Sequence, residues 1–234
     1  MRPVTAVVLA GGLGTRLQPV VSDRPKVLAP VRGRPFLAHL LDRLAAAGLW
    51  HVVLATGYGA AQVRATFGGR YRGMRLYHSE EPTPLGTGGG LARALPLVVS
   101  DPVLVLNGDS LCAVDLDAVW QTHHAHAAAG TLVVTAESNP GRYGSVEVGG
   151  DRRILGFREK HAAGRAGLVN AGIYLLSQRL LASIPRDVAM SLERDLLPAW
   201  VDLGLAAHVT DAELLDIGTP DSYAAAEDVL GRDA

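Results

Sequence analysis

Cysteine is almost absent from this chain of 234 residues, in which Cys112 is the single cysteine. A disulfide within the chain is therefore impossible, and a fold that depends on a disulfide framework is excluded. This composition is typical of a reducing compartment, and we expect a cytoplasmic protein.

The chain also lacks a large excess of charge and a long hydrophobic run. Its 22 basic residues nearly balance its 23 acidic ones, which leaves a formal net charge of −1. This balance argues against nucleic acid or an anionic membrane as a partner, so any anion site must be local. The apolar run at residues 4–9 is too short for a membrane span, and we expect neither a membrane anchor nor a signal peptide.

Hydrophobic sequence is plentiful, and it is arranged in alternating strand-like and helix-like segments. Hydrophobic residues make up 48% of the chain, enough for a sizeable core. Several continuous apolar runs predict buried strands, and a 3.6-residue periodicity before Gly48 predicts a helix. The predicted strands cover residues 4–9, 51–56, 74–79, 102–107 and 131–137, and the main predicted helices cover residues 34–48, 91–99, 191–201 and 220–230.

This alternation predicts an α/β fold, namely a three-layer, Rossmann-like arrangement with helices on both faces of a mostly parallel central sheet. The segments at residues 143–148, 152–157 and 168–176 are spaced like antiparallel or mixed strands, which predicts a mixed edge. No linker or repeat interrupts the sequence, so residues 1–234 are expected to form a single domain.

Polar, glycine-marked junctions follow several of these segments. In open α/β sheets, ligands bind beyond the carboxyl ends of the strands, so we expect the junctions to converge on one edge. They lie at residues 10–16, 107–109, 170–172 and 216–218.

The first junction is a glycine-rich loop flanked by cations. Gly11, Gly12 and Gly14 precede Arg16, and Lys26 lies further along the chain. Backbone N–H groups with cations nearby are suited to phosphate. The loop fits neither the dinucleotide pattern, because prolines follow it in place of a helix, nor the Walker pattern, which is found nowhere in the chain. Taken alone, the loop leaves an ordinary surface loop as a comparable alternative.

The loop belongs to an ordered set of short motifs that resembles the sugar-1-phosphate nucleotidyltransferase family. The motifs are LAGGLGTRL at residues 9–17 with PK at 25–26, PLGTGG at 84–89, LNGD at 106–109, EK at 159–160, NAGIY at 170–174 and DIGTP at 216–220. The set spans the chain from end to end and is far more specific than any one motif. The branch that the chain resembles most is that of the D-glycero-D-manno-heptose 1-phosphate guanylyltransferases. Val27-Leu28 and Ala171-Gly172 depart from this branch at positions that bear on the sugar or the base.

The resemblance implies a reaction in which an NTP and a sugar 1-phosphate give an NDP-sugar and pyrophosphate, with Mg²⁺ as cofactor. We expect GTP to be favoured slightly and a heptose 1-phosphate to be the acceptor; ATP or UTP, and mannose or another hexose 1-phosphate, remain alternatives. The attacking phosphate oxygen is already ionised at neutral pH, so no general base is needed. A non-catalytic nucleotide-sugar sensor and a glycosyltransferase are the competing classes, and the sequence leaves a homo-oligomer open.

The resemblance also implies roles for individual residues. Arg16 and the loop N–H groups would hold the leaving β- and γ-phosphates, and Lys26 would lie between the α-phosphate and the sugar phosphate. Asp109 and Asp216 would bind the metal, and Arg16, Lys26 and Asp109 are the candidate catalytic residues. The candidate nucleotide-binding residues are Leu9, Gly11, Gly12, Gly14, Thr15, Arg16, Tyr58, Leu85, Gly86, Thr87 and Gly88. The candidate sugar-phosphate-binding residues are Lys26, Gly144, Glu159, Lys160 and Asn170.

Other residues of functional type are expected to be structural. His123, His124 and His126 lie on an alanine-rich helix away from the glycine-marked junctions, so we do not expect a metal there. Cys112 is expected to pack in the core, and Arg24 is expected to be solvated or ion-paired.

Overall fold

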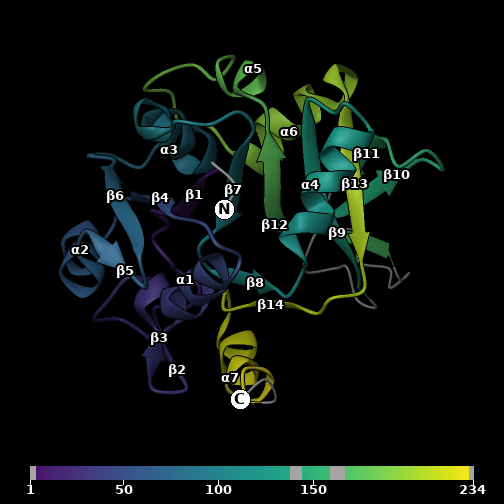
Figure 1. Ribbon diagram of the computed structural model, residues 1–234. Coiled ribbons are helices and arrows are strands. Elements are labelled where there is room, and N and C mark those ends of the chain that lie inside the picture. Colours follow the sequence, from purple (N-terminus) through teal and green to yellow (C-terminus); the bar gives the residue numbers. More distant parts are fainter. Residues whose placement is uncertain (1–3, 138–143, 159–166, 232–234) are drawn as a thin grey trace.

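The computed structural model describes residues 4–137, 144–158 and 167–231, which form an α/β fold around a ten-stranded sheet (Figure 1). The centre of the sheet is parallel: β1 pairs with β4 on one side and with β7 on the other, and β4 pairs with β6. These strands are β1 (Thr5–Ala10), β4 (His51–Thr56), β6 (Met74–Glu80) and β7 (Val103–Asn107). They occupy the residues that the apolar runs predict.

The remainder of the sheet is mixed, as the spacing of the later segments predicts. The long strand β12 runs antiparallel to both β7 and β9, and β9 pairs in parallel with β13. The strands of this part are β9 (Gly130–Glu137), β10 (Ser145–Val148), β11 (Ile154–Arg158), β12 (Gly167–Leu176) and β13 (Leu205–Thr210), and β5 (Arg70–Tyr71) closes the opposite edge. β12 therefore joins the parallel half of the sheet to the mixed half.

Helices cover both faces of the sheet, which makes three layers. Val7 and Val8 are neighbours on β1, yet they belong to two different core clusters because successive side chains of a strand point to opposite faces. Leu41 and Val119 pack on one face, and Leu91 and Trp200 pack on the other. The α-helices are α1 (Phe36–Ala46), α2 (Ala60–Phe67), α3 (Gly86–Ala94), α4 (Leu116–Ala125), α5 (Gln178–Leu181), α6 (Leu197–Ala199) and α7 (Pro220–Val229). The predicted Rossmann-like fold class is confirmed.

Two short ladders and a third core cluster hold the far end of the chain against the beginning. β8 (Ser110–Cys112) pairs antiparallel with β14 (Leu214–Asp216), and β2 (Pro30–Val31) pairs with β3 (Arg34–Pro35). Leu17, which follows the glycine-rich loop, packs in the same cluster as Ile217. The end of β14 is therefore fixed beside the loop that follows β1.

Two details differ from the sequence-based expectation. The helix expected at residues 91–99 is α3, which begins earlier, at Gly86, and includes glycines that propensity alone disfavours. Residues 170–172 lie inside β12, where its register against β9 shifts, and so do not form a junction at the end of a strand. The shift is a bulge-like irregularity, which turns side chains toward the site from within the strand.

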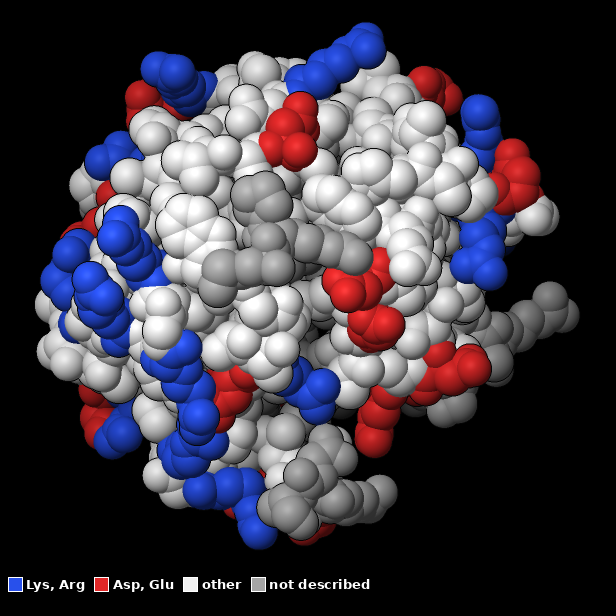
Figure 2. Space-filling model, viewed as in Figure 1, with Lys and Arg blue, Asp and Glu red and all other residues white. Residues whose placement is uncertain are grey.

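On the face seen in Figure 2, Lys and Arg side chains gather on the side where Figure 1 places α2 and β5. Part of this charge is neutralised locally, because Arg34 and Arg72 both contact the Asp42 carboxylate and Arg64 lies 4.0 Å from Glu80. Among the described residues, no helix has the length and apolar character needed to cross a membrane.

Candidate active site

Two adjoining cavities lie beyond the carboxyl ends of the parallel strands. The larger has a volume of about 470 Å³ and the smaller about 160 Å³, and both are lined by Asn107 and Asp109. Predicted residues that line the larger cavity are Leu9, Gly11, Gly12, Gly14, Thr15, Lys26, Gly86, Thr87 and Asp109. Those that line the smaller cavity are Arg16, Asp109, Asn170 and Asp216. The glycine-marked segments thus converge, as expected.

The loop after β1 shapes the larger cavity. The Gly108 N–H donates to the Leu9 carbonyl oxygen at 2.9 Å, which ties the ends of β1 and β7 together. Gly14 has a φ of +61°, and a Cβ on it would lie 3.0 Å from the Cβ of Lys26. This close approach favours glycine at position 14, and it lays the Lys26 stem against the loop.

Lys26 and Asp109 form an ion pair in the wall of the larger cavity. Lys26 Nζ contacts Asp109 Oδ2, and the Lys26 side chain is largely buried while that of Asp109 is partly exposed. Two residues expected to bind different groups, a phosphate and a metal, therefore neutralise each other. A ligand that takes up either residue has to compete with this pair.

The two aspartates expected to hold a metal both line the smaller cavity. Asp216 Oδ1 accepts hydrogen bonds from the Gly218 N–H at 2.7 Å and the Ser222 hydroxyl at 3.2 Å, which fixes its orientation. The residues that the structure describes contain no cluster of three or more metal-ligating His, Cys, Asp or Glu side chains. Mg²⁺ is commonly held by one or two carboxylates, with water and substrate phosphates completing its shell, so this donor pair fits Mg²⁺.

Asn170 presents its side chain to the smaller cavity in a fixed orientation. Its Nδ2 donates to the Tyr174 hydroxyl at 2.8 Å, and its Oδ1 accepts from the Gly172 N–H at 2.9 Å. Tyr174 is completely buried, and burial raises its pKa well above the usual value, so its hydroxyl stays protonated. Asn170 keeps one amide hydrogen and one lone pair for a ligand.

The other candidate sugar-side residues are placed differently. Glu159 and Lys160 lie outside the described residues. Gly144 precedes β10, and a Cβ on it would lie 3.0 Å from the Arg158 carbonyl oxygen. It lines neither of the two cavities.

The start of α3 also lines the larger cavity. Gly86 has a φ of +70°, and a Cβ there would lie 2.5 Å from the Met190 carbonyl oxygen, so only glycine fits. The Gly88 N–H donates to the same oxygen at 2.8 Å. Four of the candidate nucleotide-binding residues do not line this cavity: Leu85 and Gly88 are buried beside it, Tyr58 is exposed, and Arg16 lines the smaller cavity.

Glu81 lines this cavity, although the motifs do not single it out. Its Oε2 accepts the Leu85 N–H at 3.0 Å, and its Oε1 lies against the backbone at Gly11 and Gly57. Burial raises the Glu81 pKa above its usual value. The only signal in the sequence is its place just before PLGTGG.

Glu193 is a second carboxylate of the larger cavity that sequence reasoning missed. It comes from a π-helical turn, η4 (Leu192–Leu196), far from the motifs in sequence. Its Oε2 accepts from the Thr87 hydroxyl at 2.8 Å and the Ser191 hydroxyl at 3.1 Å. Its Oε1 accepts a longer bond, 3.4 Å, from Asn107 Nδ2.

The residues expected to be structural line neither of the two cavities. Cys112 is buried, and burial raises the pKa of its thiol to about 11, so it packs as an inert side chain. His123 is buried with its Nδ1 3.0 Å from the Thr131 hydroxyl, and burial lowers its pKa. Arg24 pairs with Asp23 at 2.6 Å.

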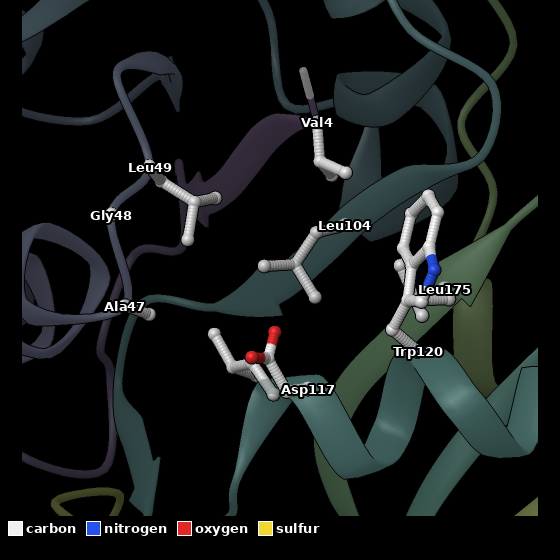
Figure 3. A pocket seen from close by; sticks show the side chains of 9 residues that line it. Val4, Ala47, Gly48, Leu49, Leu104, Asp117, Trp120 and Leu175 are labelled. Atoms are coloured by element: carbon white, nitrogen blue, oxygen red, sulfur yellow. The ribbon is translucent and has the colours of Figure 1, made fainter. Parts of the chain in front are cut away.

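A third, apolar pocket lies near the amino ends of β1 and β4, between α1 and α4 (Figure 3). Figure 3 shows Leu49, Leu104 and Trp120 around it. Its volume is about 30 Å³, room for about one water molecule, so it is no candidate for a substrate site.

The chain is similar in sequence to known proteins along most of its length. Over 224 residues the chain is 37% identical to the mannose-1-phosphate guanylyltransferase of Mycobacterium tuberculosis, covering 94% of this chain and 62% of that protein. It is 35% identical to the D-glycero-alpha-D-manno-heptose 1-phosphate guanylyltransferase of Aneurinibacillus thermoaerophilus, covering 96% of this chain and 97% of that protein. The chain thus spans less than two thirds of the first relative and nearly all of the second.

Among solved structures, HddC from Yersinia pseudotuberculosis complexed with GMP-PN superposes with a TM-score of 0.86 at 30% identity, covering 97% of this chain and 99% of HddC. A family model described as Nucleotidyl transferase matches residues 5–232. The chain therefore belongs to the nucleotidyl transferase family.

Proposed function

We propose that this protein transfers a nucleotidyl group from an NTP to a sugar 1-phosphate, giving an NDP-sugar and pyrophosphate. The observation that carries the proposal is the pair of cavities with a common wall at Asn107 and Asp109. The glycine-rich loop and Lys26 face one cavity, and Arg16, Asn170 and Asp216 face the other. Two anionic substrates can therefore meet at this wall with cations on both sides.

The residues at the wall suit an in-line displacement at phosphorus. An oxygen of the sugar phosphate attacks the α-phosphorus, a new P–O bond forms, and the bond to the β-phosphate breaks with release of pyrophosphate. Lys26 is placed to neutralise the α-phosphate and the incoming phosphate. Arg16, expected from the resemblance to hold the leaving phosphates, lines the smaller cavity and would add positive charge on the acceptor's side of the wall. Asp109 and Asp216 would hold Mg²⁺, which supplies further charge neutralisation when bound.

The structure favours guanine as the base because of Glu81. A carboxylate only accepts hydrogen bonds. The Watson–Crick edge of guanine offers two neighbouring donors, N1–H and the N2 amino group, whereas adenine presents an acceptor at N1. An ionised Glu81 at the α3 end of the larger cavity therefore suits GTP better than ATP. The two curated relatives compared above are named guanylyltransferases, which supports the same choice.

A heptose 1-phosphate is the proposed acceptor, and mannose 1-phosphate is the second candidate. The heptose 1-phosphate guanylyltransferase of Aneurinibacillus is matched over 97% of its length. The higher identity, 37%, to a mannose-1-phosphate guanylyltransferase favours mannose. We place the acceptor beside Asn170, with Gly144, Glu159 and Lys160 as the remaining sugar-side residues. A cytoplasmic location, a single domain and a possible homo-oligomer are parts of this proposal.

A substrate grid tests the proposal. Pyrophosphate release is measured for four NTPs, each with heptose, mannose and glucose 1-phosphates, in the presence of Mg²⁺. We expect the highest kcat/KM with GTP and D-glycero-D-manno-heptose 1-phosphate. If mannose 1-phosphate is better by about tenfold or more (about 1.4 kcal/mol), the heptose proposal is wrong although the reaction class stands. A chain that releases no pyrophosphate from any pair is not a nucleotidyltransferase of this kind.

A further inference from the structure

Glu193 has no assigned role, although its carboxylate faces the larger cavity. We propose that Glu193 binds the ribose hydroxyl groups of the nucleotide and selects ribonucleotides over deoxyribonucleotides. This inference rests on the proposed function, because it concerns the same nucleotide cavity.

The contacts of Glu193 place it between the two ends of that cavity. It accepts from Thr87, which follows Gly86 at the α3 end, where we place the base. It also accepts from Asn107, two residues before Asp109 at the end where we place the phosphates. In a nucleotide, the ribose is the part that lies between base and phosphates.

The orientation of the carboxylate is fixed by the protein. Thr87 Oγ1 accepts the Leu192 N–H at 2.7 Å, so its single hydroxyl hydrogen is available for Glu193 Oε2. Ser191 Oγ likewise accepts the Arg194 N–H at 3.1 Å and donates to Oε2. Oε1 has only the 3.4 Å bond from Asn107, so it keeps acceptor capacity directed at the cavity.

The chemistry of a fixed carboxylate selects the group that it binds. A phosphate is repelled by the negative charge, so the partner has to be a donor. Glu81 already supplies an acceptor near the base end, and Glu193 lines the larger cavity but not the smaller one with Asn170. The remaining donors of a nucleotide are the 2′- and 3′-hydroxyls of its ribose.

The test compares GTP with 2′-deoxy-GTP and 3′-deoxy-GTP. For each nucleotide we measure the dissociation constant by calorimetry with Mg²⁺, and kcat/KM for pyrophosphate release with the preferred sugar 1-phosphate. Hydrogen bonds to a charged group are among the strongest in proteins, so the wild type should prefer GTP to at least one deoxy form by about tenfold or more. In Glu193→Ala, the values for GTP and for its deoxy forms should differ by no more than about threefold.

Two further variants separate recognition from local structure. Asp195→Ala removes a carboxylate of the same turn that accepts the Ser191 N–H at 2.7 Å but does not line the larger cavity, and it should keep the preference. Glu193→Gln keeps an oxygen for the Thr87 and Ser191 hydroxyls, so it should fold like the wild type and show a reduced preference even if the alanine variant does not fold.

Several results overturn the inference. The inference fails if the wild type binds and uses GTP and both deoxy forms equally well, or if the Glu193 variants keep the wild-type preference. It also fails if Asp195→Ala loses the preference to the same extent, or if the Glu193 variants change only the KM of the sugar 1-phosphate. If the protein prefers another NTP to GTP, the same comparison is made with the 2′-deoxy and 3′-deoxy forms of that NTP. If no NTP reacts, the proposed function fails, but the binding ratios still test Glu193.

Discussion

Asp109 lines both cavities and contacts Lys26, so under the proposed function it lies where the two substrates would meet. We expect Asp109→Asn to lower kcat by about 10²–10³-fold, the usual cost of removing one electrostatic element of a phosphoryl-transfer site. The free energy of unfolding should change by no more than about 1 kcal/mol, because the carboxylate is partly exposed.

Steady-state kinetics at saturating Mg²⁺ and urea unfolding measure the two quantities for Asp109→Asn. Asp202→Asn, which alters an exposed aspartate remote from both cavities, serves as the control. Wild-type turnover in the Asp109 variant would show that this carboxylate is not needed by the reaction.

Glu81 carries the prediction about the base. Glu81→Gln places an amide where guanine requires acceptors, so the ratio of kcat/KM for GTP over ATP should fall about tenfold or more. Glu80→Gln is the matched control, because Glu80 is the exposed neighbour and its side chain lies 4.0 Å from Arg64. An unchanged ratio in Glu81→Gln would mean that the base is read by other groups.

The pKa of Glu81 adds a pH dependence to this prediction. Burial raises that pKa, so on acidification Glu81 takes up a proton at a higher pH than an ordinary glutamate. The preference for GTP should therefore be complete well above the raised pKa and should be lost as the pH falls through it. Glu81→Gln should show no such loss.

At the scale of elements, the start of α3 depends on a glycine that contacts another segment. Gly86→Ala puts an alanine into a left-handed backbone, with its Cβ 2.5 Å from the Met190 carbonyl oxygen. We therefore expect it to destabilise the protein by more than the roughly 1–3 kcal/mol of backbone strain alone. Gly33→Ala separates the two effects, because Gly33 has a similar φ of +73° and nothing within 4 Å of its added Cβ.

Urea unfolding measures both glycine variants, and the KM for the NTP reports on the cavity that Gly86 lines. We expect the NTP KM to rise in Gly86→Ala alone. Equal losses of stability in the two variants would contradict a tight contact between α3 and the Met190 segment.

The sequence predicts elements well where one local pattern dominates. The strand expected at residues 51–56 is β4 (His51–Thr56), because a continuous apolar run buried on both faces has no competing arrangement. The beginning of α3 could not be predicted, because its glycines are selected by packing against Met190 and Leu196 rather than by helix propensity. The bulge-like shift at residues 170–172 likewise depends on pairing with β9, which a single segment does not reveal.

At the scale of the molecule, the convergence of distant motifs follows from one topological rule. Parallel strands end at the same edge, so residues 10–16 and 107–109 had to meet there. Glu81 and Glu193 could not be predicted in the same way, because no motif gives either residue a role and each lines the cavity only through the packing of its segment. Glu193 reaches the cavity because η4 packs on α3, a contact between segments about a hundred residues apart.

The common wall of the two cavities has a consequence for the end of the reaction. Under the proposed function, the NDP-sugar is one molecule that fills the places of two, so binding by either half holds the other at a high effective concentration. Pyrophosphate has no such second attachment and is free to leave first. Under the proposed function we therefore expect the larger product to leave after pyrophosphate, and its departure rather than the chemical step to limit turnover.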